Sequence, residues 1–305
     1  MSKQTVINIG IIGNGFVGQA TRLFETVHDS SAPPQRAHIN ALIYDIVPEK
    51  CVPIGLTLKD MVEQTHIVFI CVPTPTNQDG KCDTTIVKQC INDLHILTDS
   101  MSEQSRPFIV VRSTVPIGFC EQYHVNHMPE FLTEANWRHD FYMCELWVIG
   151  VADTTRYREF EVLMGELLNI AHRNGCVKFV NKRYVDTNTS EFIKYGRNCF
   201  LAVKLSLCNE YYAFCTASGI NYNEAISIIG DDKRIGTRYT NVPGVDGKKG
   251  WGGTCLPKDT CAFSKQFQSI GVQCPVLDAA IQRNNHIDRP EQDWKDEENK
   301  GRTYV

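Results

Sequence analysis

One short glycine-rich segment places a cysteine where a helix is expected to begin. It runs from Gly250 to Asp259 and carries Cys255 just before a helix that Pro257 would open. The partial positive charge of a helix N-terminus, together with the neighbouring Lys258, favours a thiolate over a thiol at this position. Because the thiolate is the nucleophilic form, the segment predicts covalent catalysis by Cys255.

A second signature, near the N-terminus, has the spacing of a dinucleotide-binding turn. In such turns the first glycine permits the tight turn, the second lets the pyrophosphate approach the backbone, and the third lets helix pack on strand. Asp45, at the end of the next expected strand, would accept hydrogen bonds from the adenosine ribose and repel the extra phosphate of NADP. We therefore expect NAD, with a Rossmann-like domain that binds another ligand as the alternative. The motif is Gly13-Asn14-Gly15-Phe16-Val17-Gly18.

A nicotinamide cofactor combined with a nucleophilic cysteine predicts a particular oxidation. An aldehyde captured by Cys255 becomes a thiohemiacetal, and its oxidation gives a thioester that water can hydrolyse. This chemistry carries an alcohol past the aldehyde to an acid.

The residues around these signatures predict an α/β fold followed by helices. β-α alternation up to about residue 186 favours a doubly wound parallel-sheet, Rossmann-like domain over residues 1–187. The remainder predicts an all-helical dimerisation domain over residues 188–289, with a long central helix from Thr189, and a polar C-terminal tail over residues 290–305. Strands are expected at residues 6–12, 41–45, 66–71, 108–112, 147–150 and 177–180, and helices at 16–26, 85–97, 189–216, 222–229 and beyond 257.

Composition and charge exclude several classes of protein. The chain is 42% hydrophobic and 22% charged with a net charge of −4, which is ordinary for a globular protein and gives no sign of a nucleic-acid partner. Its thirteen cysteines form no C-x-x-C pair, so we expect buried thiols in a reducing compartment rather than disulfides or a metal site. With no signal-peptide-like start and no membrane-spanning run, the expected location is the cytoplasm.

Five segments in order resemble the UDP-glucose and GDP-mannose dehydrogenase family, especially its UDP-glucose-oxidising members. The resemblance runs from about residue 6 to about residue 288. It implies a homodimer formed through the long central helix. The segments are residues 72–83, 113–118, 129–134, 191–198 and 252–259.

Several residues of these segments gain expected roles at the cofactor side. Pro73 and Thr74 follow a strand at the edge where doubly wound sheets bind ligands, and two prolines there would rigidify a loop against the cofactor. By the resemblance, Thr114 holds a water and the nicotinamide side of the site. Glu130 is implied to activate the hydrolytic water, and Glu134 to support that role beside substrate and cofactor. The alternatives are a plain strand-to-turn segment at Thr114 and a solvated pair of glutamates.

Other residues are expected to bind the substrate. Lys194 and Asn198 lie four apart on the expected helix, where they could stabilise an alkoxide or a thiohemiacetal oxyanion; a surface pair is the alternative. Arg234 resembles the arginine that binds the sugar or diphosphate across a dimer interface, although a loop arginine is more often simply exposed. The resemblance adds substrate contacts at Phe131, Leu132 and Gly252.

The resemblance implies the conversion of UDP-glucose and two NAD to UDP-glucuronate. Lys194 and a water held by Asp259 would stabilise the alkoxide, Cys255 would capture the aldehyde, and water activated by Glu130, Thr114 or Asp259 would hydrolyse the thioester. Family members carry a second Rossmann-like domain for the nucleotide, and the sequence stops about where it should begin. We therefore expect a shortened enzyme, one that needs a separate partner, or a fold with altered activity.

Two other functions stay open at this point. A dehydrogenase of the 3-hydroxyacid or 6-phosphogluconate type has a similar sheet and helical domain, but it transfers a single hydride and needs no nucleophilic cysteine. A catalytically weak or idle NAD-binding scaffold subunit would need none of the catalytic side chains together.

Overall fold

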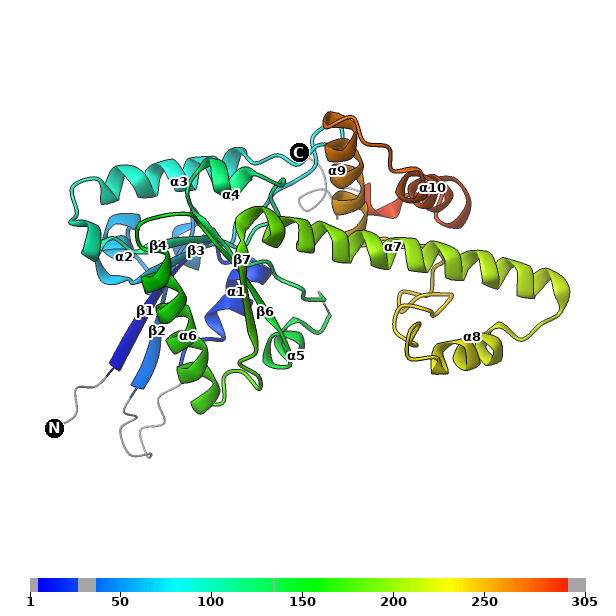
Figure 1. Cartoon of the computed structure of the whole chain (residues 1–305), viewed down its shortest axis with the longest axis horizontal. Coiled ribbons are helices and arrows are strands. Elements are labelled where there is room, and N and C mark those ends of the chain that lie inside the picture. The colour runs from blue at the N-terminus through cyan, green and yellow to red at the C-terminus, as the bar shows by residue number, and fades with distance from the viewer. Residues whose placement is uncertain (1–4, 27–36, 134, 296–305) are drawn as a thin grey trace. The chain divides into compact units, whose positions relative to one another are not determined.

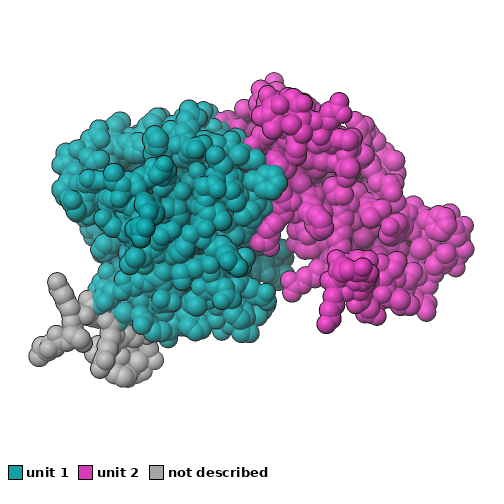
Figure 2. All heavy atoms as spheres, viewed as in Figure 1, with its two compact units in different colours: residues 1–74, 84–194 teal, residues 75–83, 195–305 magenta. Residues whose placement is uncertain are grey.

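The structure is a computed structural model that describes residues 5–26, 37–133 and 135–295 (Figure 1). The chain divides into two compact units, coloured separately in Figure 2. Unit 1 comprises residues 1–74 and 84–194, and unit 2 comprises residues 75–83 and 195–305.

The described residues of unit 1 form a seven-stranded sheet in the order β2-β1-β3-β4-β5-β6-β7. Neighbouring strands pair in parallel, apart from β5 and β6, which are antiparallel. The mostly parallel sheet confirms the predicted Rossmann-like α/β fold. The strands are β1 Thr5–Ile12, β2 Ala37–Tyr44, β3 Ile67–Ile70, β4 Phe108–Val111, β5 Asn126–His127, β6 Trp147–Val151 and β7 Lys182–Asp186.

Helices cover both faces of this sheet, as Figure 1 shows. On one face, α1, α5 and α6 contribute Ala20, Phe141 and Phe160 to a buried cluster with the strands. On the other face, Met61 of α2 and Ile91 of α3 pack in a second cluster, together with α4. Strands covered on both faces must be apolar throughout, and β3 is buried at every position. The helices are α1 Phe16–Arg22, α2 Leu58–Gln64, α3 Thr85–Thr98, α4 Phe119–Gln122, α5 Trp137–Tyr142 and α6 Tyr157–Arg173, with 3₁₀ turns at Pro48–Lys50 and Glu103–Ser105.

Helices build the described part of unit 2. The long helix α7 begins at the end of β7, and from Tyr195 onward it belongs to this unit. Two small cores form along it: Cys199 packs with Phe263 of α9 and Leu277 of α10, and Cys215 packs with Tyr222 of α8. The helices are α7 Thr187–Ser218, α8 Tyr222–Asp231, α9 Leu256–Ser269 and α10 Pro275–Arg283, followed by a π-helical turn at Asn284–Asp288 and a 3₁₀ turn at Asp293–Lys295.

Three local expectations differ from the structure. The predicted strand at residues 177–180 is wrong, because the strand at this edge of the sheet is β7, Lys182–Asp186. Its exposed charges are typical of an edge strand and hide it from a search for apolar runs. The helix expected over residues 16–26 ends at Arg22. Within the expected tail, Trp294 is buried at 3% exposure, and residues 296–305 lie outside the described residues.

Candidate active site

The predicted dinucleotide turn lies between β1 and α1 and uses its glycines sterically. Gly13 has φ +94°, a left-handed conformation that favours glycine. A Cβ on Gly18 would lie 1.9 Å from the Gly13 carbonyl oxygen, so only glycine fits there. A Cβ on Gly15 would meet nothing within 4 Å, which leaves open space over the turn. Phe16 and Val17 begin α1.

Asp45, just after β2, contacts this turn directly. Its carboxylate accepts a hydrogen bond from the Asn14 backbone N–H at 2.7 Å and another from the Val47 N–H at 2.9 Å. The Cys51 thiol also donates a hydrogen bond to the backbone carbonyl oxygen of Asp45, at 3.3 Å. The structure thus brings the predicted ribose-binding carboxylate to the glycine turn.

The loops after β3 and β4 are joined at the same sheet edge. Ser113 Oγ donates to the Val72 carbonyl oxygen at 2.6 Å, which fixes the start of the Pro73-Thr74 loop to the residue before Thr114. Thr74 is buried. Because carboxyl ends of parallel strands form the ligand-binding edge of such sheets, the predicted cofactor residues gather where a dinucleotide would bind.

Glu130 and Lys194 form a buried ion pair in unit 1. Lys194 Nζ lies 2.6 Å from Glu130 Oε1, and the two side chains are 4% and 6% exposed. The ammonium also donates to the Glu130 carbonyl oxygen at 2.8 Å, and the Leu132 N–H donates to the second carboxylate oxygen at 2.8 Å. The ring of Phe131 lies 5.9 Å from Lys194 Nζ. These four predicted residues therefore lie together, whereas Glu134 lies outside the described residues.

Two further buried ionisable groups of unit 1 were not predicted as site residues. Glu191 is 0% exposed and accepts hydrogen bonds from the N–H groups of Gly118 at 2.7 Å and Cys120 at 2.8 Å. Burial raises the pKa of Glu191 to about 7. Burial, reinforced by Lys194, lowers the pKa of His127 to about 3. Glu191 stands one turn before Lys194, and that spacing was the available signal.

Cys255 stands at the N-cap of α9 and begins a polar cluster in unit 2. One turn later Asp259, 1% exposed, accepts hydrogen bonds from Asn198 Nδ2 and from Lys258 Nζ, each at 2.6 Å. Burial alone would lower the pKa of Lys258, but the charge of Asp259 raises this pKa above its usual range. Thr254 Oγ1 lies 3.7 Å from Cys255 Sγ. The predicted nucleophile Cys255 and carboxylate Asp259 thus lie at the start of α9, and the predicted amide Asn198 reaches Asp259 from α7.

The remaining predicted substrate residues differ in their surroundings. Arg234 lies in the loop after α8 and pairs with Asp232 at 2.6 Å; its side chain is 89% exposed. Gly252 lies in the loop before α9, and a Cβ there would meet the guanidinium of Arg289 at 2.6 Å.

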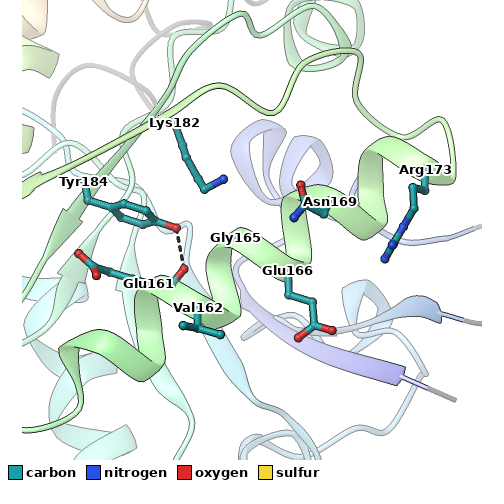
Figure 3. A pocket seen from close by; sticks show the side chains of 8 residues that line it. All are labelled: Glu161, Val162, Gly165, Glu166, Asn169, Arg173, Lys182 and Tyr184. Carbon is teal, nitrogen blue, oxygen red and sulfur yellow. Dashed lines mark hydrogen bonds between the residues drawn. The ribbon is translucent and has the colours of Figure 1, made fainter. Parts of the chain in front are cut away.

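Two cavities open on unit 1. One lies between α6 and β7 and has a volume of about 540 Å³; Figure 3 shows the Tyr184 hydroxyl donating to the Glu161 carbonyl oxygen there at 2.6 Å. It contains none of the predicted site residues. The other, about 720 Å³, includes Asn14 of the glycine turn. None of the helices in the described ranges combines the length and the hydrophobicity of a membrane-spanning segment. In the same ranges, no three His, Cys, Asp or Glu side chains converge as for a metal ion.

Known proteins match most of the chain. Residues 42–167 match the NAD binding domain of the UDP-glucose/GDP-mannose dehydrogenase family, and residues 188–286 match the central domain of that family. A UDP-glucose 6-dehydrogenase of Rickettsia bellii is 32% identical over 236 residues, which cover 73% of this chain and 50% of the relative. The chain spans about half to two thirds of the length of the curated relatives it matches.

Two solved structures share the fold. The UDP-glucose dehydrogenase of the hyperthermophilic archaeon Pyrobaculum islandicum superposes with a TM-score of 0.75 at 23% identity, covering 94% of this chain and 69% of that chain. A 3-hydroxyisobutyrate dehydrogenase of Mycobacterium tuberculosis superposes with a TM-score of 0.64 at 13% identity, covering 95% and 96%. The fold is therefore shared by proteins that bear different names.

Proposed function

The chain belongs to the UDP-glucose/GDP-mannose dehydrogenase family, and we propose that it oxidises the primary alcohol of a nucleotide sugar to a carboxylate with NAD. The proposed reaction converts UDP-glucose and two NAD to UDP-glucuronate, and the relatives named UDP-glucose 6-dehydrogenase support this choice of sugar. The observation that carries the proposal is the Cys255 cluster, in which a cysteine at a helix start precedes a buried aspartate bound by Asn198 and Lys258.

The residues at the sheet edge fit NAD. Gly18 allows α1 to approach Gly13 closely, and the open space beside Gly15 leaves room for a pyrophosphate. The Asp45 carboxylate retains lone pairs that can accept hydrogen bonds from a ribose. Bound NAD would accept one hydride in each of the two oxidations.

The remaining steps are assigned to side chains of this chain. The alcohol passes its proton to a water held by the Asp259 carboxylate, and Lys194, as a buried ammonium, stabilises the negative charge left on the alcohol oxygen. The Cys255 thiolate then adds to the aldehyde carbon, and the carbonyl oxygen becomes the thiohemiacetal oxygen, which Asn198 stabilises as an oxyanion. Loss of the second hydride leaves a thioester. Glu130 takes a proton from water, the hydroxide adds to the thioester carbon, and the C–S bond breaks to leave the carboxylic acid and the Cys255 thiolate.

We also propose a homodimer in the cytoplasm. Phe192, Phe200 and Phe214 on α7 are 51%, 71% and 66% exposed, and a row of large apolar side chains along one helix is typical of an interface. Arg234, exposed in the loop after α8, would then reach substrate across that interface. All thirteen cysteines are free thiols, as in a reducing compartment.

The decisive experiment counts NADH per sugar for the wild type and Cys255→Ser. UDP-glucose, UDP-N-acetylglucosamine and GDP-mannose are assayed in parallel, and Cys261→Ser, a thiol on the same helix α9, is the matched control. We expect two NADH per UDP-glucose, lost or stalled in Cys255→Ser and kept in Cys261→Ser. One NADH per substrate with full turnover in Cys255→Ser would instead indicate a single-hydride dehydrogenase. NAD binding without any turnover would indicate the scaffold.

A further inference from the structure

In unit 2, one buried amide holds the loop that leads to Cys255. Asn284 is 0% exposed; its Oδ1 accepts a hydrogen bond from the Trp251 N–H at 2.7 Å, and its Nδ2 donates to the Trp251 carbonyl oxygen at 3.0 Å. Two further bonds reach the same stretch from α7: the Gly250 N–H donates to Asn209 Oδ1, and Trp251 Nε1 donates to Ser206 Oγ, each at 3.0 Å. Both sides of the Trp251 peptide backbone are thus fixed by a single side chain.

A buried arginine holds the same loop from the segment after α10. Arg289 is 4% exposed. Its Nε and Nη2 donate to the two carboxylate oxygens of Asp293 at 2.6 and 2.7 Å, and its Nη1 donates to Asp246 in the loop at 2.7 Å. Lys248, also in the loop, donates to Asp293 at 2.6 Å. Arg289 therefore joins the chain after α10 to the loop before α9 through charge-assisted bonds.

The guanidinium of Arg289 also lies against the backbone of the loop. A Cβ on Gly252 would meet Arg289 Cζ at 2.6 Å and both terminal nitrogens at 2.9 Å. Gly252 precedes Cys255 by three residues. The rings of Trp251 and Trp294 also stack, with centroids 6.5 Å apart. A movement of Arg289 would therefore displace the backbone at Gly252, three residues before Cys255.

The loop needs such support because of its composition. Between residues 244 and 253 it contains five glycines, and Gly247, Gly250 and Gly253 have positive φ. Glycine loses more conformational freedom on ordering than any other residue, so a free loop of this kind would sample many conformations. Asn284 begins a π-helical turn and Arg289 caps it, through the bond from the Arg289 N–H to the Asn284 carbonyl oxygen at 2.8 Å. Turns of this kind are rare and are frequently found at functional sites.

We propose that Asn284 and Arg289 are positioning residues that hold residues 250–252, and through them Cys255, in the conformation required for attack on the substrate. The part of this proposal that concerns attack rests on the proposed function of Cys255. Burying a guanidinium and an amide is costly unless both are hydrogen-bonded. Here the bonds of Asn284 to Trp251 and the Arg289 Nη1 bond to Asp246 reach the loop before the nucleophile. In this proposal neither the Asn284 nor the Arg289 side chain touches the substrate, and both act through the loop.

The test measures hydrogen exchange at the Trp251 amide in the intact protein. In the wild type this N–H is donated to a buried acceptor, so it should exchange slowly. Arg289→Gln leaves Asp246 and Asp293 without their shared cation, and we expect exchange at Trp251 to quicken by about tenfold or more. Arg289→Lys keeps the positive charge but loses the bidentate contact with Asp293. Its exchange rate at Trp251 should lie between those of the wild type and Arg289→Gln.

The matched control is Arg156→Gln in unit 1. Arg156 pairs with Glu159 at 2.9 Å and donates to the Glu103 carbonyl oxygen at 2.6 Å, so its loss removes comparable bonds away from the loop. It should leave exchange at Trp251 and kcat unchanged. For Arg289→Gln, kcat should fall about tenfold while the KM for NAD stays unchanged, because the glycine turn in unit 1 is untouched.

Two results would overturn the proposal: exchange at Trp251 within about twofold of wild type in Arg289→Gln, or equal acceleration in Arg156→Gln. Should Arg289→Gln fail to fold, Asp246→Asn removes only the loop carboxylate charge that Arg289 contacts, and the same exchange criterion applies. Full turnover in Cys255→Ser would reject the proposed function but leave the exchange result standing, so the two failures are distinguishable.

Discussion

The buried pair of Lys194 and Glu130 allows a quantitative test of how unit 1 is stabilised. Their charged atoms lie 2.6 Å apart and their side chains are 4% and 6% exposed, so water cannot compensate either charge if the other is removed. Lys194→Met keeps the apolar stem and removes the ammonium. Breaking a buried pair in this way costs about 3–5 kcal/mol, because an uncompensated charge stays buried, and we expect the free energy of unfolding to fall by that amount.

The double variant Lys194→Met with Glu130→Gln separates charge from packing. It removes both charges, so the penalty of a lone buried carboxylate disappears. We expect it to be more stable than Lys194→Met alone by about 2 kcal/mol, a coupling far from additivity. Both variants should lose turnover, because both side chains are assigned to the reaction.

Urea unfolding at pH 7, followed by tryptophan fluorescence, measures these differences. The control is Lys59→Met, which removes an exposed pair with Glu63 at 3.8 Å whose side chains are 69% and 55% exposed. Such surface pairs contribute about 0–1 kcal/mol. If Lys194→Met costs no more than Lys59→Met, or if the double variant is no more stable than Lys194→Met alone, the reasoning from burial is refuted.

Two further predictions concern unit 1. Burial raises the pKa of Glu191 from 4.5 to about 7, so between these pH values the folded chain keeps the carboxyl proton and the unfolded chain has lost it. The free energy of unfolding therefore falls as pH rises from about 4.5 to 7. The shift corresponds to about 3 kcal/mol. Urea unfolding at pH 5 and pH 8 should show Glu191→Gln losing most of this dependence; equal dependence in both proteins would contradict the assignment. Gly18→Ala would place a Cβ 1.9 Å from the Gly13 carbonyl oxygen, whereas Gly15→Ala meets nothing within 4 Å. Calorimetry should find NAD affinity reduced about tenfold or more in both and the melting temperature lowered only in Gly18→Ala, because only that Cβ collides with backbone; a melting temperature that is the same in both would argue against the glycine packing.

Residue patterns predicted the centre of the fold and missed its edges for physical reasons. The apolar runs of β1, β3 and β4 follow from burial on both faces of a parallel sheet, and they are visible without any tertiary information. The edge strand β7 carries charges instead, and β5 is only two residues long, so pairing with neighbours defines both. Local pattern cannot show such pairing.

Site residues divide in the same way. Lys194 and Asn198, or Cys255 and Asp259, are related by a single helical turn and could be proposed from spacing alone. The bond between Arg289 and Asp246 joins residues 43 positions apart, and that between Asn284 and Trp251 joins residues 33 apart. Such contacts depend on how the segment after α10 packs against the loop before α9, and a short sequence motif does not encode that packing. The roles assigned to the predicted side chains stay predictions.

The many sulfur atoms in this chain have a practical consequence for chemical probes. Burial raises the pKa of Cys71 and Cys90 to about 11 and that of Cys120 well above its usual range. Thiols of this kind stay protonated near neutrality and react slowly with electrophiles. Cysteine-directed covalent fragments could therefore be screened on the unaltered protein, with these three thiols contributing little background to labelling elsewhere, at Cys255 for example.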